Sequence, residues 1–117
     1  MSFRVVPGFI GLALVMTAVT MAVAQRPQLG GYKAASVSDE GVVAAADFAV
    51  AKEEETTEGL ALDEILKAET QSVAGTNYRL CLKVTLGDDS QEVQTIVNRN
   101  LKGEFSVISW TPKECAP

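Results

Sequence analysis

The two thiols of this 117-residue chain belong to Cys81 and Cys115, and the chain contains no histidine. A cysteine or serine nucleophile activated by histidine is therefore impossible. A zinc site that uses histidine is excluded, and two cysteines are too few for a site made only of cysteines. No glycine-rich phosphate loop occurs. The sequence therefore predicts a protein that is not an enzyme and that uses no metal or other cofactor.

The two cysteines have a structural use instead. An even pair of cysteines in an exported protein usually forms one disulfide. Cys81 lies between Arg79 and Lys83, and Cys115 lies in a tail beyond the last predicted strand. The tail has to fold back to bring the two thiols together. We expect a Cys81–Cys115 bridge within one chain, with pairing between two chains as the alternative.

The first 24 residues are predicted to be a secretory signal peptide. Arg4 is their only charge, residues 9–23 are almost wholly apolar, and residues 22–24 form an Ala-x-Ala site. An uncleaved membrane anchor is the alternative, but the apolar stretch is short for the roughly 20 residues that span a bilayer. We expect cleavage after Ala24, a mature domain of residues 25–117, and secretion without a membrane anchor.

The charge of the mature chain excludes one class of partner. Removing Arg4 from ten basic residues leaves nine, against fifteen acidic residues, so the net charge is −6. This charge repels phosphate, and no basic patch is visible. Nucleic acid is therefore not an expected partner.

A hairpin is predicted where the segment 71–78, Gln-Ser-Val-Ala-Gly-Thr-Asn-Tyr, leads into an alternating strand. Strict alternation is typical of a strand with one buried face. Gly75 supplies the backbone freedom that the turn needs. The residues expected on the buried face are Tyr78, Leu80, Leu82, Val84 and Leu86.

The pattern Gln-x-Val-x-Gly followed by Asn-Tyr resembles the first inhibitory loop of the cystatins, protein inhibitors of papain-like cysteine proteases. Three further features occur in the order typical of that family. Leu29-Gly30-Gly31 is similar to its N-terminal trunk, Asp47-Phe48-Ala49-Val50 to the core of its helix, and residues 65–70 to the strand that enters the loop. The resemblance covers about residues 28–110.

The resemblance implies that three segments meet at one end of a sheet and block a protease cleft without being cleaved. Leu29 would fill the apolar specificity pocket, which contributes about 1.5–3 kcal/mol, and Gly30 would turn the chain away from the nucleophile. Loop tips held by paired strands lose little entropy on docking. The protease-binding residues implied in the two loops are Gln71, Ser72, Val73, Ala74, Gly75, Asn100 and Leu101.

The second loop departs from the family. Cystatins usually carry Pro-Trp there, whereas this chain has Asn100 and Leu101. Leu101 offers less area than an indole, and Asn100 lacks the restriction that proline provides. Weaker or more selective inhibition is expected. A cystatin-fold binding module without effective inhibition is the alternative function, because a fold does not guarantee an activity.

The predicted fold class is α+β, with a single helix packed on a four- to five-stranded antiparallel sheet, in a monomer. The helix is expected from an N-cap at Ser38 to about Glu55, with Val43, Ala46 and Val50 on one face. Residues 60–73 fit a helical spacing, but the resemblance implies a strand. Further strands are expected at 93–97 and 104–110, around a second hairpin loop at 98–103.

Overall fold

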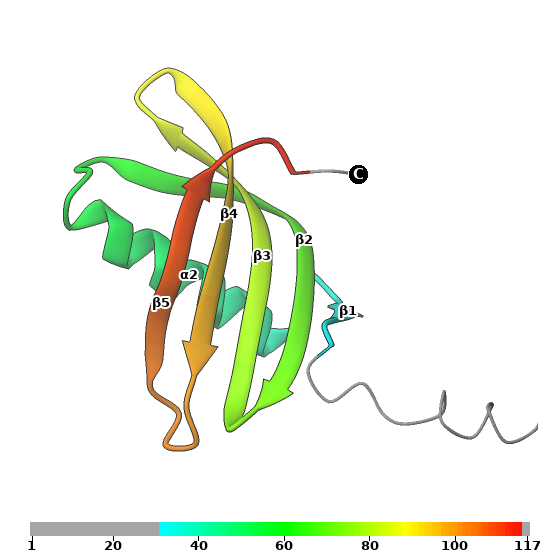
Figure 1. Cartoon of the computed structure of the whole chain (residues 1–117). Helices are drawn as coiled ribbons and strands as arrows, with labels where there is room; N and C mark the ends of the chain where they lie inside the picture. The colour runs from blue at the N-terminus through cyan, green and yellow to red at the C-terminus, as the bar shows by residue number, and fades with distance from the viewer. Residues whose placement is uncertain (1–30, 116–117) are drawn as a thin grey trace, which may run out of the picture.

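One helix crosses one face of a five-stranded antiparallel sheet in the computed structural model, which describes residues 31–115 (Figure 1). This confirms the predicted α+β class with a single helix on an antiparallel sheet, and the strands follow one another in the sheet in chain order. The predicted signal peptide, Leu29 and Gly30 lie outside the described residues. The elements are β1 (Lys33–Ala35), α2 (Glu40–Glu54), β2 (Leu60–Val73), β3 (Gly75–Leu86), β4 (Asp89–Arg99) and β5 (Phe105–Pro112).

The alternating strand β3 supplies the centre of the core. Four of its predicted inward residues have exposed fractions of 6% or less: Tyr78, Leu80, Leu82 and Val84. Leu86 is 40% exposed, contrary to the prediction, because it ends the strand beside the turn at Gly87. Two valines of β4, Val93 and Val97, complete this layer and are fully buried.

The helix begins one residue later than predicted. Asp39 is the N-cap, and its Oδ2 accepts hydrogen bonds from the backbone N–H groups of Gly41 and Val42 at 3.1 and 3.2 Å. Ser38 cannot serve as the cap because it belongs to the preceding turn, where its own N–H donates to the Ser36 hydroxyl. A carboxylate at this position also complements the helix dipole.

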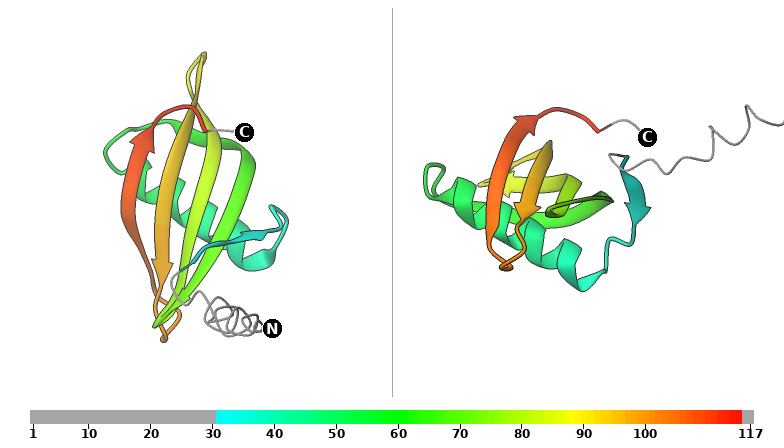
Figure 2. Two further views of the ribbon diagram at one scale, coloured as in Figure 1. Left: turned by 45° about the vertical axis from the view of Figure 1, so that its right-hand side comes forward. Right: turned by 60° about the horizontal axis from the view of Figure 1, so that its bottom comes forward.

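The helix packs through small side chains, so it can lie close to the curved sheet (Figure 2). Its buried residues are Val42, Ala45, Ala46, Ala49 and Val50. The predicted face was therefore right for Ala46 and Val50 but wrong for Val43, which is 37% exposed. Val42 takes the place of Val43 on the buried face, because Val42 and Ala46 are four residues apart and share a face.

The pairing of strand β2 explains why its sequence has a helix-like spacing of apolar residues. Its pairing with β3 shifts register between Leu62 and Glu64 and again between Ile65 and Lys67. Each bulge adds one residue, so inward side chains recur every third residue rather than every second. Leu62, Ile65 and Ala68 consequently all contact the core. The helix-like spacing is the signature of a twice-bulged strand.

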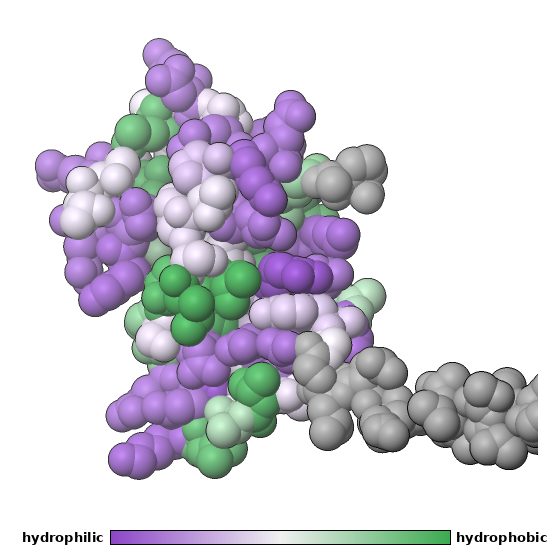
Figure 3. All heavy atoms as spheres, viewed as in Figure 1, coloured by the Kyte–Doolittle hydropathy of each residue, from purple (hydrophilic) through white to green (hydrophobic). Residues whose placement is uncertain are grey.

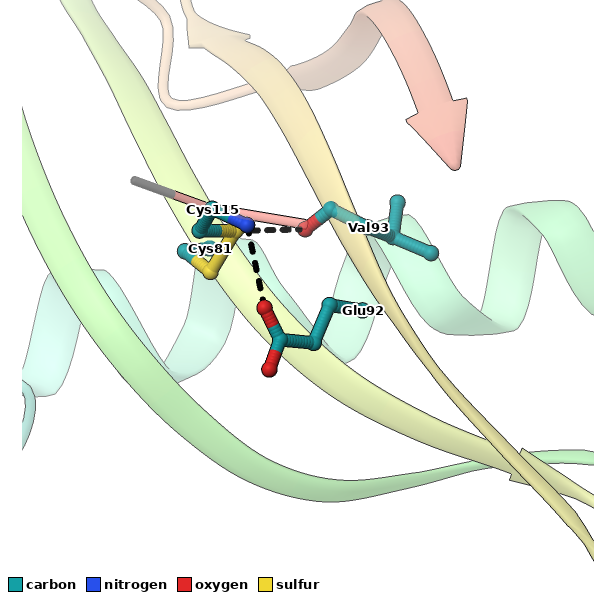
Figure 4. Close-up of a disulfide and its surroundings, with 4 residues drawn as sticks. All are labelled: Cys81, Glu92, Val93 and Cys115. Carbon is teal, nitrogen blue, oxygen red and sulfur yellow. Dashed lines mark hydrogen bonds between the residues drawn. A yellow bond between two sulfur atoms is a disulfide. The ribbon is translucent and has the colours of Figure 1, made fainter. Parts of the chain in front are cut away.

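The C-terminal tail folds back across β4 and joins β3 through the Cys81–Cys115 disulfide, as Figure 4 shows. The two Cα atoms are 6.0 Å apart. Glu92 holds the tail twice: its carbonyl oxygen accepts from Lys113 N–H, and its carboxylate accepts from Cys115 N–H, both at 3.0 Å. The tail thereby covers Cys81, which is only 4% exposed although it lies on the polar face of β3. Within residues 31–115, no helix combines the length and apolar character needed to span a bilayer.

Leu82→Ala and Leu101→Ala test this division between core and surface. Leu82 is fully buried whereas Leu101 is 82% exposed. We expect Leu82→Ala to lower the free energy of unfolding by about 2–5 kcal/mol, and Leu101→Ala to change it by less than about 0.5 kcal/mol. Urea denaturation of both variants measures the difference. Equal losses would show that the core lies elsewhere.

Candidate functional site

The tips of the β2–β3 and β4–β5 hairpins lie side by side at one end of the sheet (Figures 1 and 2). Val73 pairs with Gly75, so the first tip is the single residue Ala74. Arg99 pairs with Phe105, and residues 100–104 form the second tip. We call this end, with Val73, Ala74, Gly75, Asn100 and Leu101, the loop end.

Gly75 joins the two hairpins by close backbone approach. Its φ of +102° lies in the left-handed region that favours glycine. A Cβ at this position would overlap the carbonyl oxygen of Arg99 and would lie 3.0 Å from the Cα of Asn100. The sequence predicted the turn but not this contact, which fixes the first tip against the start of the second.

A row of amide side chains crosses three strands just behind the tips. Asn77 Nδ2 donates to Gln71 Oε1 at 2.9 Å, and Asn98 Nδ2 donates to Asn77 Oδ1 at 2.8 Å. Gln71 therefore supports the loop from behind, whereas Ser72 is exposed beside the tip. The structural roles of Asn77 and Asn98 were not predicted, although both belong to short polar runs next to the loops.

Asn100 organises the second tip and corrects the expectation of an unrestricted loop. Its Oδ1 accepts from the backbone N–H groups of Lys102 and Glu104, each at 2.9 Å. Its Nδ2 donates to Glu104 Oε1 and its backbone N–H to the Glu104 carbonyl oxygen, again at 2.9 Å. These bonds close the turn without a proline, because an asparagine side chain can imitate a backbone turn.

Apolar side chains are presented to solvent at the loop end. Val73 is 45% exposed and Leu101 is 82% exposed, and Figure 3 shows apolar surface at the lower end of the molecule in this view. A shallow pocket of about 280 Å³ lies between the two tips, lined by Ala74, Asn100, Leu101, Lys102 and Glu104. Exposed apolar area on a supported frame is what a binding surface requires.

Strand β1 directs the N-terminal segment toward the same end. It is antiparallel to β2, with Lys33 opposite Thr70 and Ala35 opposite Ala68. Followed back toward the N-terminus, β1 therefore runs along β2 in the direction of Val73. Leu29 and Gly30 lie outside the described residues, so their roles stay predictions.

A stacked ion pair lies where this segment begins. The Arg79 guanidinium carbon is 4.1 Å from the centre of the Tyr32 ring, and Arg79 Nε donates to Glu69 Oε1 at 2.8 Å. The hydrogen bond from Arg79 lowers the pKa of Glu69, and the positive charges of Arg79 and Lys67 add to that shift against the opposing effect of burial. Glu69 is therefore an ionised partner for Arg79.

Comparison with known proteins finds relatives that are described as protease inhibitors. Residues 34–112 match a family model described as SQAPI, aspartic acid proteinase inhibitor. Salivary cystatin-L2 of Ixodes scapularis is 42% identical over 71 residues, covering 45% of this chain and 52% of the relative. Cysteine proteinase inhibitor 5 of Arabidopsis thaliana is 35% identical over 79 residues, covering 66% of this chain and 65% of the relative. The chain thus spans between half and two thirds of the length of these curated relatives.

Solved structures share the fold. A salivary cystatin from the soft tick Ornithodoros moubata superposes with a TM-score of 0.64 at 19% identity, covering 73% of this chain and 98% of that one. Dimeric human cystatin F superposes with a TM-score of 0.58 at 21% identity, covering 75% and 90%. At such low identity these likenesses concern the fold alone.

Gly75→Ala and Gly87→Ala test the contact between the hairpins. Both glycines have positive φ, but a Cβ at Gly87, in the turn at the other end of β3, would meet nothing within 4 Å. We expect Gly87→Ala to cost about 1–2 kcal/mol of unfolding free energy for its backbone conformation. Gly75→Ala adds a steric clash, so we expect about 2–5 kcal/mol. Equal losses in chemical denaturation would show that Gly75 serves only the turn.

Glu69→Gln tests the ion pair through pH. A lowered folded pKa means that the Glu69 carboxylate stabilises the fold above its ordinary value of 4.5. That stabilisation disappears as pH falls through the folded pKa. We expect the unfolding free energy of the wild type to exceed that of Glu69→Gln by about 0.2–1 kcal/mol at neutral pH, as is usual for partly exposed pairs. This advantage should disappear as the pH falls below the lowered pKa of Glu69. A difference that persists in acid would assign the effect to packing.

Proposed function

Because this chain belongs to the cystatin family of cysteine protease inhibitors, we propose that it is a reversible, tight-binding inhibitor of papain-like, cathepsin-type proteases. The loop end enters the active-site cleft and covers the catalytic cysteine of the protease. The observation that carries this proposal is the presentation of Val73 and Leu101 on two tips that contact each other through Gly75.

The two tips suit a cleft for physical reasons. Ala74 and Gly75 are small, so the backbone of the first tip can approach the protease closely. The amide row behind the first tip and the Asn100 hydrogen bonds within the second restrict both before binding. Little conformational entropy is then lost on docking. Apolar area on Val73 and Leu101 supplies the favourable contact.

The N-terminal arm, the segment before Tyr32 that carries Leu29 and Gly30, completes the proposed surface. Leu29 enters the apolar specificity pocket, and Gly30 turns the chain away from the nucleophile so that no scissile bond is presented. The direction of β1 toward the loop end supports this role. Gln71 and Ser72 belong to the surface by the family resemblance, with Gln71 acting mainly from behind the tip.

The proposal also covers the export of the protein and its oligomeric state. We infer an inhibitor that catalyses no reaction, is exported after cleavage at Ala24 and acts as a monomer through residues 25–117. The Cys81–Cys115 disulfide and the similarity to a relative named a salivary cystatin support export. The exposed Leu101 in place of an aromatic residue favours weaker inhibition, and a binding module without effective inhibition is the limiting case.

A second target class follows from one observation. The family model that matches residues 34–112 is described as an inhibitor of aspartic acid proteinases. Inhibition of an aspartic protease such as pepsin is therefore the alternative activity. The curated relatives, one named a cystatin and one a cysteine proteinase inhibitor, favour cysteine proteases.

Titration of papain with the mature chain and three aspartate variants tests the proposal. Val73→Asp and Leu101→Asp would place an unpaired charge in a desolvated interface, so each should raise the inhibition constant about tenfold or more. Ile108→Asp is the matched control, because Ile108 is also an exposed aliphatic residue, at 62%, but lies within β5 away from the tips. Its inhibition constant should stay unchanged.

A parallel titration of pepsin separates the two target classes. The proposal predicts inhibition of papain and none of pepsin. Inhibition of pepsin alone would move the function to the aspartic class. Papain inhibition that all three variants retain would place the contact surface outside the loop end.

A further inference from the structure

The stack of Tyr32, Arg79 and Glu69 lies where the N-terminal segment joins the sheet. Tyr32 precedes β1, Arg79 belongs to β3 and Glu69 to β2, which lies between the other two strands. Ala34 pairs with Glu69, and Glu69 pairs with Arg79. Tyr32 lies two residues before Ala34 and therefore projects to the same face of the sheet. The Arg79 side chain reaches across β2 to the ring.

Stability of the fold is a poor explanation for this stack. The side chains of Arg79 and Glu69 are 35% and 22% exposed, and ion pairs of such exposure contribute little to folding. The stack is separate from the core cluster, which the helix and the opposite face of the sheet form. Its most direct effect is on Tyr32, the residue that follows Gly30-Gly31.

The segment before the helix has little else to hold it to the sheet. Strand β1 has three residues, paired with Thr70, Glu69 and Ala68 of β2. Three bonded residues from Tyr32 back to Leu29 reach at most about 10 Å. If β1 frayed as far as the N-cap Asp39, Leu29 could reach about 33 Å from its attachment. The attachment of Tyr32 therefore decides how widely the arm can range.

We propose that Tyr32, Arg79 and Glu69 form an anchor that aims the N-terminal arm at the protease cleft. Arg79 and Glu69 are positioning residues that act through Tyr32. Glu69 holds the guanidinium from one side while the ring faces it, as a cation–π contact requires. The N-terminal segment then starts from a fixed point at Tyr32. The inference rests on the proposed function, because the anchor matters for inhibition only if the arm contacts the protease.

Tyr32→Ala and Tyr32→Phe distinguish an anchor from an ordinary surface contact. Each is made in the mature chain and in a chain that begins at Gly31, which retains every described element. In the mature chain, Tyr32→Ala should raise the papain inhibition constant about 3- to 10-fold, because the free arm must then be ordered on binding. Tyr32→Phe keeps the ring face and should leave the constant unchanged. In the shortened chain, Tyr32→Ala should have no effect.

Arg79→Met should raise the inhibition constant of the mature chain as Tyr32→Ala does. In the shortened chain it should, like Tyr32→Ala, have no effect. Circular dichroism confirms the fold of each variant. A direct readout is the heteronuclear NOE of the Gly31 amide in the free protein, which should fall in Tyr32→Ala but not in Tyr32→Phe.

The outcomes separate this inference from the proposed function. A wild-type chain that leaves papain fully active contradicts the proposed function. Two outcomes overturn the anchor alone. In the first, Tyr32→Ala weakens inhibition equally in the mature and the shortened chain. In the second, removal of the arm weakens inhibition but Tyr32→Ala in the mature chain does not. An unchanged NOE at Gly31 also overturns it.

Discussion

The whole arrangement depends on β3 being paired along its full length on both sides. Its register with β2 runs from Leu60–Leu86 to Val73–Gly75, and its register with β4 from Thr76–Arg99 to Leu86–Asp89. Its inner face is buried under the helix, and its outer face carries Arg79 and Cys81. The position of β3 therefore determines the position of both hairpins. Strand β3 is itself one strand of the first hairpin, and it pairs with β4, which is one strand of the second.

The loop end is rigid for local reasons as well. The backbone of Gly75 lies so close to that of Arg99 that no Cβ fits between them, so the two hairpins contact each other directly behind the tips. Amide side chains bridge β2, β3 and β4 immediately behind, and Asn100 closes the second tip. Where cystatins usually place Pro-Trp, this chain obtains restriction from hydrogen bonds and retains only an aliphatic contact. Compared with a Pro-Trp loop, the second tip of this chain is restricted by hydrogen bonds instead of proline and presents less apolar area.

Much of the fold could be predicted from the sequence, because the alternation of apolar and polar residues in the central strand agreed with the order of motifs typical of the cystatin family. The central strand and the hairpin at Gly75 follow from local patterns, and the four- to five-stranded sheet was predicted with the help of the family resemblance. The disulfide partners follow from an even number of cysteines in a chain expected to be exported. The start of the helix was off by one residue because Ser38 and Asp39 are both good caps, and only tertiary contacts choose between them. The two bulges of β2 give its inward residues a spacing of three, and periodicity alone assigns such a spacing to a helix rather than to a strand.

The site was harder to predict than the fold. Exposure of Val73 and Leu101 follows from their places in turns, but the contact of Gly75 with Arg99 joins residues 24 positions apart. The restriction of Asn100 depends on the position of Glu104, which a loop prediction cannot supply. The Tyr32–Arg79 stack joins a residue that precedes β1 to a residue of β3, and these two strands are not neighbours in the sheet. These features require three-dimensional register as well as residue type.

The central claim is that the loop end occupies the active-site cleft of a papain-like protease. Isothermal titration calorimetry of the mature chain against free papain, and against papain whose cleft is filled by a covalent peptidyl inhibitor, tests it most directly. The account predicts one chain bound per free papain and no measurable binding to the filled enzyme. Equal affinity for both forms would contradict it, because the chain would then bind outside the cleft.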